Sequence, residues 1–481
     1  MLSRFQKKLF IIWRRSLCFT PRLLRIVVVC FGSGALTACG EQNVVTTKPV
    51  ESGFVGSVAA DEPHAAQIAY NVMERGGNAA DAATALGLAL AVTLPSRASL
   101  GSGGACLAWR PGESTGQAFE FLPRRGRYAN SGADRPAAVP MLARGLFLLQ
   151  LRYGSVQLAD LFVPARDLAA RGVPVSRLLA SDLATVKNAL LADNNARTVF
   201  ARRDGTLLKA DDILVQTRLA GALERLRIAG VGDLYGGALG QAFVTGTNAA
   251  GGALTIQDLR RSLVQVEKPL TARQNGVDLS FLPPPADGGL GMAARYLSHG
   301  KIIYADQVVA AWRQQNKGQM RPIAEAQHIL DSGRFPQGMS LPPLPASTSY
   351  VVTDRSGETV ACVLTMNNLF GTGRIAGSTG IVLAASPLRR PQPLLPAGIA
   401  HIGNQQLRAV AAASGQNSAA DAAALALRAA VAGVNPKPIK GGSGRANSVS
   451  CPAGLPGDAG RCFAWTDPQG KGLALPIVHK H

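Results

Sequence analysis

The sequence is poor in aromatic residues and in charge for its length. Of its 481 residues, 5% are aromatic and 17% are charged, whereas 47% are hydrophobic. This composition is typical of a globular chain and excludes a disordered one. The length is sufficient for a large core of two or four layers, and with so few aromatic rings we expect small aliphatic side chains to fill it.

Motifs for metal and phosphate chemistry are also missing. The sequence has no Cys-x-x-Cys pair and no His-Glu-x-x-His segment, which argues against a zinc site. The glycine-rich run at 440–445 lacks the spacing of a phosphate-binding loop. We therefore predict no metal and no cofactor.

Acidic residues are absent from the first 38 residues, which carry seven Lys and Arg. The apolar run 26–38 that follows these charges is shorter than the roughly 20 residues of a membrane-spanning helix. A basic segment, a short apolar run and small residues before Cys39 are typical of a secretory signal, and the Leu-Thr-Ala-Cys ending resembles the lipobox of bacterial lipoproteins. We predict a signal at 1–38, a lipid on Cys39 and a polar tether over 39–53. An ordinary cleaved signal is the alternative.

These features predict a protein held by its lipid at the periplasmic face of a bacterial membrane. Gly40, and not Asp, follows Cys39, which favours the outer membrane. Without residues 1–38 the net charge falls from +20 to +13, because 43 Lys and Arg and 30 Asp and Glu remain. The charges are scattered and not interleaved with aromatic residues, which favours a solvated basic surface near anionic lipid over a nucleic-acid site.

Four cysteines follow Cys39. Cys451 and Cys462 flank a loop rich in proline and glycine, and an exported protein keeps its disulfides, so we predict a bond between them. Cys106 and Cys362 lie in apolar runs, where we expect buried thiols.

Hydrophobic periodicity predicts helices between two groups of strands. Residues 64–75 and 78–94 have helical spacing, with Gly76-Gly77 as a stop and Asn78 as an N-cap. Further helices are expected within 138–240, 290–335 and 417–433, and strands at 101–110, 276–281, 347–354 and 358–366. A turn at 355–357 joins the last two strands into a hairpin, and 462–475 is expected to form a closing hairpin. Sheets covered by helices are the expected result.

Ser347, Thr348 and Ser349 open the first strand of the 347–366 hairpin, directly after a proline-rich loop. Hydroxyl clusters commonly mark turns and strand starts, so the cluster alone does not indicate chemistry. The functional interpretation of these hydroxyls depends on the motifs that surround them in the sequence.

Seven segments, in one order, resemble the γ-glutamyltransferase (γ-glutamyltranspeptidase) family of N-terminal-nucleophile hydrolases. They are 65–104, 139–154, 158–172, 251–259, 283–289, 348–383 and 465–474. The resemblance implies an α+β fold, a four-layer αββα sandwich, made as a precursor that cuts itself. It also implies a large and a small chain that stay associated as a heterodimer, and a new N-terminal nucleophile that attacks γ-glutamyl amides such as glutathione.

The resemblance places the nucleophile at Ser347, where the family has Thr. Thr348 takes the second threonine of the motif and is the second-choice nucleophile. The cut would lie between Ala346 and Ser347, dividing a large-chain region at 54–346 from a small-chain region at 347–481. Once exposed, the α-amine of Ser347 can act as its base, because its pKa lies near ~7.7–8.0.

Two residues of the second strand also match the family. Thr365 takes the position that hydrogen-bonds the nucleophile, and Asn367 takes one that contacts the α-amino end of the substrate.

The family's other substrate-binding positions are changed. Leu122 replaces the arginine that holds the α-carboxylate, with Arg124 or Arg125 as the nearest substitute. Ser386 and Arg389 stand where the family has an acid for the α-amino group, and Leu395 and Pro396 replace a pair of serines. Gln416 and Asn417 replace the two glycines of the oxyanion hole, although their backbone N–H groups can still donate.

We therefore expect acyl transfer or hydrolysis of γ-glutamyl amides of the glutathione class, by Ser347 after self-cleavage. The expected partners are a small amide substrate and a membrane reached through Cys39, with no nucleic acid. Two alternatives stay open: a non-catalytic lipoprotein that retains the fold, and an amidase or acylase of the same fold with another substrate.

Overall fold

We describe a computed structural model of the chain. The structure describes residues 53–127, 133–298, 302–316, 322–389, 392–439 and 441–476. The predicted signal at 1–38, Cys39 and the tether up to residue 52 lie outside the described residues. Within the described part, no helix has both the length and the apolar character needed to cross a membrane.

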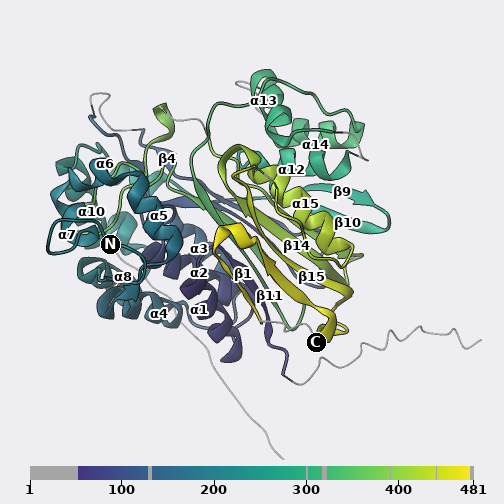
Figure 1. Cartoon of the computed structure of the whole chain (residues 1–481), viewed down its shortest axis with the longest axis horizontal. Helices are drawn as coiled ribbons and strands as arrows, with labels where there is room; N and C mark the ends of the chain where they lie inside the picture. Colours follow the sequence, from purple (N-terminus) through teal and green to yellow (C-terminus); the bar gives the residue numbers. More distant parts are fainter. Residues whose placement is uncertain are drawn as a thin grey trace, which may run out of the picture. The chain divides into compact units, whose positions relative to one another are not determined.

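Two antiparallel sheets lie at the centre of the fold (Figure 1). The seven-stranded sheet has the order β17-β1-β11-β12-β2-β3-β8, and the six-stranded sheet has the order β16-β15-β14-β13-β10-β9. The first contains β1 (Gly56–Ala60), β2 (Gly103–Trp109), β3 (Gln117–Phe121), β8 (Gln265–Glu267), β11 (Ser347–Asp354), β12 (Thr359–Thr365) and β17 (Leu473–Leu475). The second contains β9 (Leu270–Gln274), β10 (Val277–Phe281), β13 (Ala397–Ile402), β14 (Gln406–Ser414), β15 (Arg445–Leu455) and β16 (Phe463–Thr466).

The sheets pack face to face through small aliphatic side chains. Val351 and Val363 of one sheet share a buried cluster with Ile399, Val410 and Val449 of the other. Because side chains alternate along a strand, the residues between these positions face the helices outside. The low aromatic content is thus accommodated by closely packed Ala and Val.

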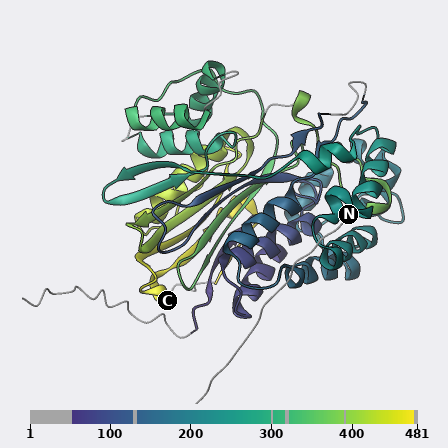
Figure 2. The same ribbon diagram turned by 180° about the vertical axis from the view of Figure 1, so that it is seen from behind.

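Helices cover the outer face of each sheet (Figures 1 and 2). The seven-stranded sheet packs against α1 (Pro63–Glu74), α2 (Ala79–Thr93) and α3 (Leu142–Tyr153). Further out, α4 (Leu158–Arg171) packs on α2, and α8 (Thr217–Ala229) packs on α4. The six-stranded sheet packs against α12 (Gly288–Leu297), α14 (Pro322–Ser332) and α15 (Ala419–Val431), and α13 (Ala305–Gln315) packs on α12. Further helices that share the core of the first group are α5 (Arg177–Thr185), α6 (Lys187–Leu191), α7 (Asn194–Phe200), α9 (Asp233–Gly236), α10 (Ala238–Ala249) and α11 (Ile256–Arg261).

Helix α2 is buried along its whole length, as its alanine-rich sequence permits. Asn78 is its N-cap, as expected, and forms a reciprocal capping box with Asp81. At Gly87 an added Cβ would lie 2.7 Å from a methyl carbon of Leu146 and 2.9 Å from the Tyr350 hydroxyl. Glycine at this position lets the Leu146 and Tyr350 side chains of α3 and β11 lie directly against α2, and a larger residue would have to displace them.

One expectation about strand pairing is wrong. Residues 462–475 do not form a hairpin, because β16 pairs with β15 in one sheet and β17 with β1 in the other. The turn at Pro468–Gly470 carries the chain from one sheet to the other, and β17 covers the edge that β1 would otherwise expose.

The cysteines form two disulfides. Cys451–Cys462 is bonded, which confirms that prediction, but Cys106 and Cys362 are also bonded and are not free thiols. They stand directly opposite each other on β2 and β12, with their Cα atoms 4.1 Å apart. Sequence periodicity places both residues in strands but does not give the register that brings them together. This bond connects the 54–346 region to the 347–481 region.

Candidate active site

Ser347 is the first residue of β11 and lies opposite Thr365 of β12. The strand begins here because the loop before it contains Pro342, Pro343 and Pro345, which cannot donate ladder hydrogen bonds. The Ser347 hydroxyl is buried and has no hydrogen-bond partner among the described residues. An unpaired buried hydroxyl costs about 1–3 kcal/mol. Nine other buried side-chain N or O atoms of the described residues are unpaired as well, so it is the position of Ser347 next to the Ala346 carbonyl that gives its free hydroxyl a functional meaning.

The carbonyl that precedes Ser347 is held by Thr365. The Thr365 hydroxyl donates to the Ala346 oxygen at 3.1 Å and accepts the backbone N–H of Asn367 at 3.0 Å. Because that hydroxyl has a single proton, these two contacts direct it at the Ala346 carbonyl. Thr365 therefore contacts the bond that would be cut, and not the Ser347 hydroxyl.

Asn367 is fixed in a left-handed conformation, with φ of 55°. Its side-chain amide donates to the Pro123 oxygen at 3.2 Å and to the Ala385 oxygen at 3.0 Å. These contacts hold the backbone N–H that orients the Thr365 hydroxyl, so Asn367 supports the cleavage geometry.

Asn417 and Gln416 lie in the turn after β14. The Asn417 side chain donates to the Leu341 oxygen at 2.8 Å and accepts the Leu344 N–H at 3.1 Å. It thereby anchors the loop that leads to the Ala346–Ser347 bond. Gln416 is exposed, with φ of 56°. The oxyanion role of these two backbones stays a prediction.

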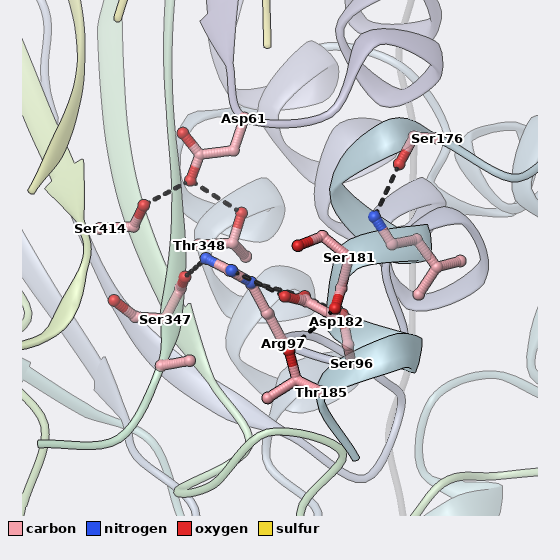
Figure 3. A network of polar contacts seen from close by, with 12 residues as sticks. Asp61, Ser96, Arg97, Ser176, Ser181, Asp182, Thr185, Ser347, Thr348 and Ser414 are labelled. Carbon is pink, nitrogen blue, oxygen red and sulfur yellow. Dashed lines mark hydrogen bonds and ion pairs between the residues drawn. The ribbon is translucent and has the colours of Figure 1, made fainter. Parts of the chain in front are cut away.

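Asp61 holds the strand just beyond Ser347 (Figure 3). Its carboxylate accepts hydrogen bonds from the Thr348 hydroxyl at 3.2 Å, the Ser349 N–H at 2.9 Å and the Ser414 hydroxyl at 2.7 Å. Asn447 of β15 donates to its other oxygen at 2.8 Å. Burial raises the pKa of Asp61. Since the Thr348 hydroxyl is engaged here and that of Ser347 is not, the geometry favours Ser347 as the nucleophile.

A buried ion pair contacts Ser347 from the other side. Arg97 donates to the Ser347 carbonyl oxygen at 3.1 Å, and its guanidinium binds both oxygens of Asp182 at 2.8 and 2.9 Å (Figure 3). The Ser96 hydroxyl also donates to Asp182 at 2.7 Å. This cluster ties helix α5 and the turn after α2 to the first residue of β11.

Sequence reasoning missed Asp61, Arg97 and Asp182. Arg97 lies just before the glycine turn at 101–104, and Asp61 follows the apolar run of β1, so each charge next to a buried element was a usable signal. Asp182 lies in a helix with ordinary periodicity and had no such signal.

A cavity of about 380 Å³ adjoins Asn367 and is also lined by Leu122 and Arg124. Arg124 makes an ion pair with Glu120, which also accepts the Leu122 N–H at 3.0 Å. Arg124, rather than Leu122, thus presents a cation to the cavity that contains Asn367. Buried Ser386 lines a separate cavity of about 390 Å³, and Leu395 is fully buried in the core between the sheets.

No metal centre is evident in the part of the chain that the structure describes, where no three His, Cys, Asp or Glu side chains gather as metal ligands would.

The family model of gamma-glutamyltranspeptidase matches residues 65–334. The chain belongs to this family. It is 29% identical over 395 residues to the glutathione hydrolase proenzyme of Escherichia coli, a match that covers 71% of this chain and 67% of that one. It is 27% identical over 375 residues to glutathione hydrolase 3 of Arabidopsis thaliana, covering 68% of this chain and 59% of the relative.

Solved structures confirm the four-layer α+β sandwich. The cephalosporin acylase of Bacillus halodurans superposes with a TM-score of 0.67 at 18% identity, over 89% of this chain and 96% of that one. The gamma-glutamyltranspeptidase of Helicobacter pylori superposes with a TM-score of 0.52 at 23% identity, over 61% of this chain and 95% of that one. At these identities the superpositions concern the fold alone.

Proposed function

We propose that this member of the gamma-glutamyltranspeptidase family is a self-processing enzyme that transfers or hydrolyses γ-glutamyl amides through Ser347. The relatives named glutathione hydrolase support the substrate class. The observation that carries the proposal is the buried, unbonded Ser347 hydroxyl beside a carbonyl that Thr365 already polarises.

Self-cleavage begins with attack of the Ser347 oxygen on the Ala346 carbonyl carbon. The C–N bond then breaks, the hydroxyl proton ends on the departing nitrogen, and an ester replaces the amide. Thr365 donates to the oxygen on which negative charge develops, which is the role of an oxyanion-hole donor. Water then hydrolyses the ester and leaves a carboxylate on Ala346 and a free amine and hydroxyl on Ser347.

The free amine supports the second reaction. It accepts the Ser347 hydroxyl proton as that oxygen attacks the substrate amide, and it returns the proton to the leaving amine. Water or another amine then takes the acyl group from Ser347. Arg124 and Asn367, which line the adjacent cavity, are the proposed contacts for the acyl group.

Export and lipid attachment at Cys39 belong to the proposal as well. Two disulfides in the described residues support export, because such bonds persist in oxidising compartments, and the Leu-Thr-Ala-Cys ending supports the lipid on Cys39. Labelling with a radioactive fatty acid should mark the natural chain and not a Cys39→Ala variant. Labelling of both would contradict lipid attachment at Cys39.

Turnover of chromogenic anilides tests the activity. We expect the purified protein to release the aniline from γ-glutamyl anilide, and Ser347→Ala to release none. Release only from anilides that lack the glutamyl amino group would instead support an acylase of the same fold.

A further inference from the structure

A second and larger hollow adjoins the cavity that contains Asn367. It has a volume of about 1010 Å³, and Arg124 and Arg125 line both spaces. We call it the arginine groove, after the five arginines that line it: Arg124, Arg125, Arg127, Arg260 and Arg261. They come from β4 (Arg124–Arg125), the segment after it and the last turn of α11, so two distant parts of the sequence contribute to one cationic surface.

The charge of the groove is poorly balanced. Counting both cavities, the five arginines face two acids, Glu120 and Asp258, which leaves 5 − 2 = +3. Asp258 already accepts the N–H and the hydroxyl of Thr255 at 2.9 and 2.7 Å, in the capping box of α11. Arg125, Arg127 and Arg260 are exposed and form no ion pair with any residue the structure describes.

Asn367 connects the groove's neighbouring cavity to the residues around the reacting bond. Asn367 lines the first cavity, and its N–H orients the Thr365 hydroxyl that contacts the Ala346 carbonyl. Arg124 and Arg125 then lead from that cavity into the groove. The positively charged surface thus begins at a cavity lined by Asn367, two residues after the Thr365 that contacts the Ala346 carbonyl.

We propose that the arginine groove binds a carboxylate-bearing chain, an acidic peptide, that extends from the amide cleaved at Ser347. This inference rests on the proposed function, because it assigns the substrate class of that site. Arginine pairs with carboxylates in bidentate geometry. Nucleic acid is disfavoured because the lining includes no aromatic ring on which a base would stack, and a lipid surface is disfavoured because the site is concave.

Binding to the uncut Ser347→Ala protein tests the groove without any turnover. Calorimetry with a glutamate hexamer should show binding that weakens between low salt and about 0.15 M salt, as expected for exposed charges. Arg127→Ser with Arg260→Ser should weaken it about 5- to 30-fold, since each charged contact contributes about 0.5–1 kcal/mol. Arg203→Ser with Arg334→Ser is the matched control, because it removes two exposed arginines elsewhere and should leave binding unchanged.

Three outcomes would overturn the inference: no binding of the hexamer, an equal loss in the control pair, or tighter groove-dependent binding of an oligonucleotide or of anionic vesicles. A turnover assay separates this failure from that of the proposed function. An active enzyme with equal kcat/KM for acidic and neutral γ-glutamyl peptides refutes the groove alone. A protein that cleaves neither substrate refutes the proposed function, while the calorimetry still decides the groove.

Discussion

The Cys106–Cys362 disulfide joins the two chains that a cut after Ala346 would leave, and its removal should destabilise the fold strongly. The bonded residues are 256 positions apart, whereas Cys451 and Cys462 are 11 apart. Loop-closure entropy assigns about 5.5 kcal/mol to a loop of the first length and about 2.8 kcal/mol to one of the second. The longer bridge should therefore contribute about 2–3 kcal/mol more to the free energy of unfolding.

The comparison needs an uncut chain, so both pairs are replaced by alanine in the Ser347→Ala background. All four cysteines are buried, so each double variant loses similar packing. Urea unfolding should give a larger loss of unfolding free energy for the Cys106/Cys362 pair than for the Cys451/Cys462 pair. Equal losses, or a larger loss for the second pair, would refute the reasoning.

Three further predictions concern the site and the pH dependence of the fold. Thr365→Val should slow self-cleavage about 10²–10³-fold, because only the hydroxyl reaches the Ala346 oxygen, and Thr365→Ser should keep it. A gel time course in which the valine variant is cut at an unchanged rate would count against this role. Asn417→Ala keeps the backbone N–H of residue 417 but removes the side-chain hydrogen bonds to Leu341 and Leu344. Self-cleavage should therefore slow about tenfold, while the cut enzyme keeps its turnover. Self-cleavage at the rate of the natural protein would show that these two hydrogen bonds are not needed. Burial, and then the nearby Asp354 charge, raises the pKa of Glu358 to about 8. Between these two pKa values, the folded chain keeps the Glu358 proton and the unfolded chain loses it. The contribution of Glu358 to the free energy of unfolding is therefore fully present below about pH 4.5 and is lost as the pH rises through about 8. The free energy of unfolding of the natural protein should fall by about 3–5 kcal/mol more between pH 5 and 9 than that of Glu358→Gln. Urea unfolding that shows the same pH dependence for both proteins would contradict this.

Local sequence patterns predicted much of the architecture because they depend on local physics. The periodicity of 64–75 and 78–94 and the Asn78 cap gave two helices with nearly correct ends. The 347–354 and 359–365 strands followed from alternation around a glycine turn. Their order along the chain predicted sheets covered by helices, whereas the four-layer sandwich followed from the resemblance to the family.

Features that depend on distant pairing were not predictable in the same way. The Cys106–Cys362 bond requires the register of β2 against β12, and β17 pairs with β1 only because that edge is available. The contacts of Asp61 and Arg97 with β11 join residues about 250–290 positions apart. No periodicity encodes such contacts, although the charge at the end of an apolar run marks both residues.

Denaturing gel electrophoresis of the purified protein, with and without reductant, tests most directly whether the chain cuts itself before Ser347. A cut before Ser347 leaves a C-terminal chain of 481 − 346 = 135 residues that begins Ser-Thr-Ser-Tyr. The account predicts two chains with reductant, one band without it because Cys106–Cys362 links them, and a single band in both lanes for Ser347→Ala. A single full-length band for the natural protein under reducing conditions, or continued splitting of Ser347→Ala, would contradict it.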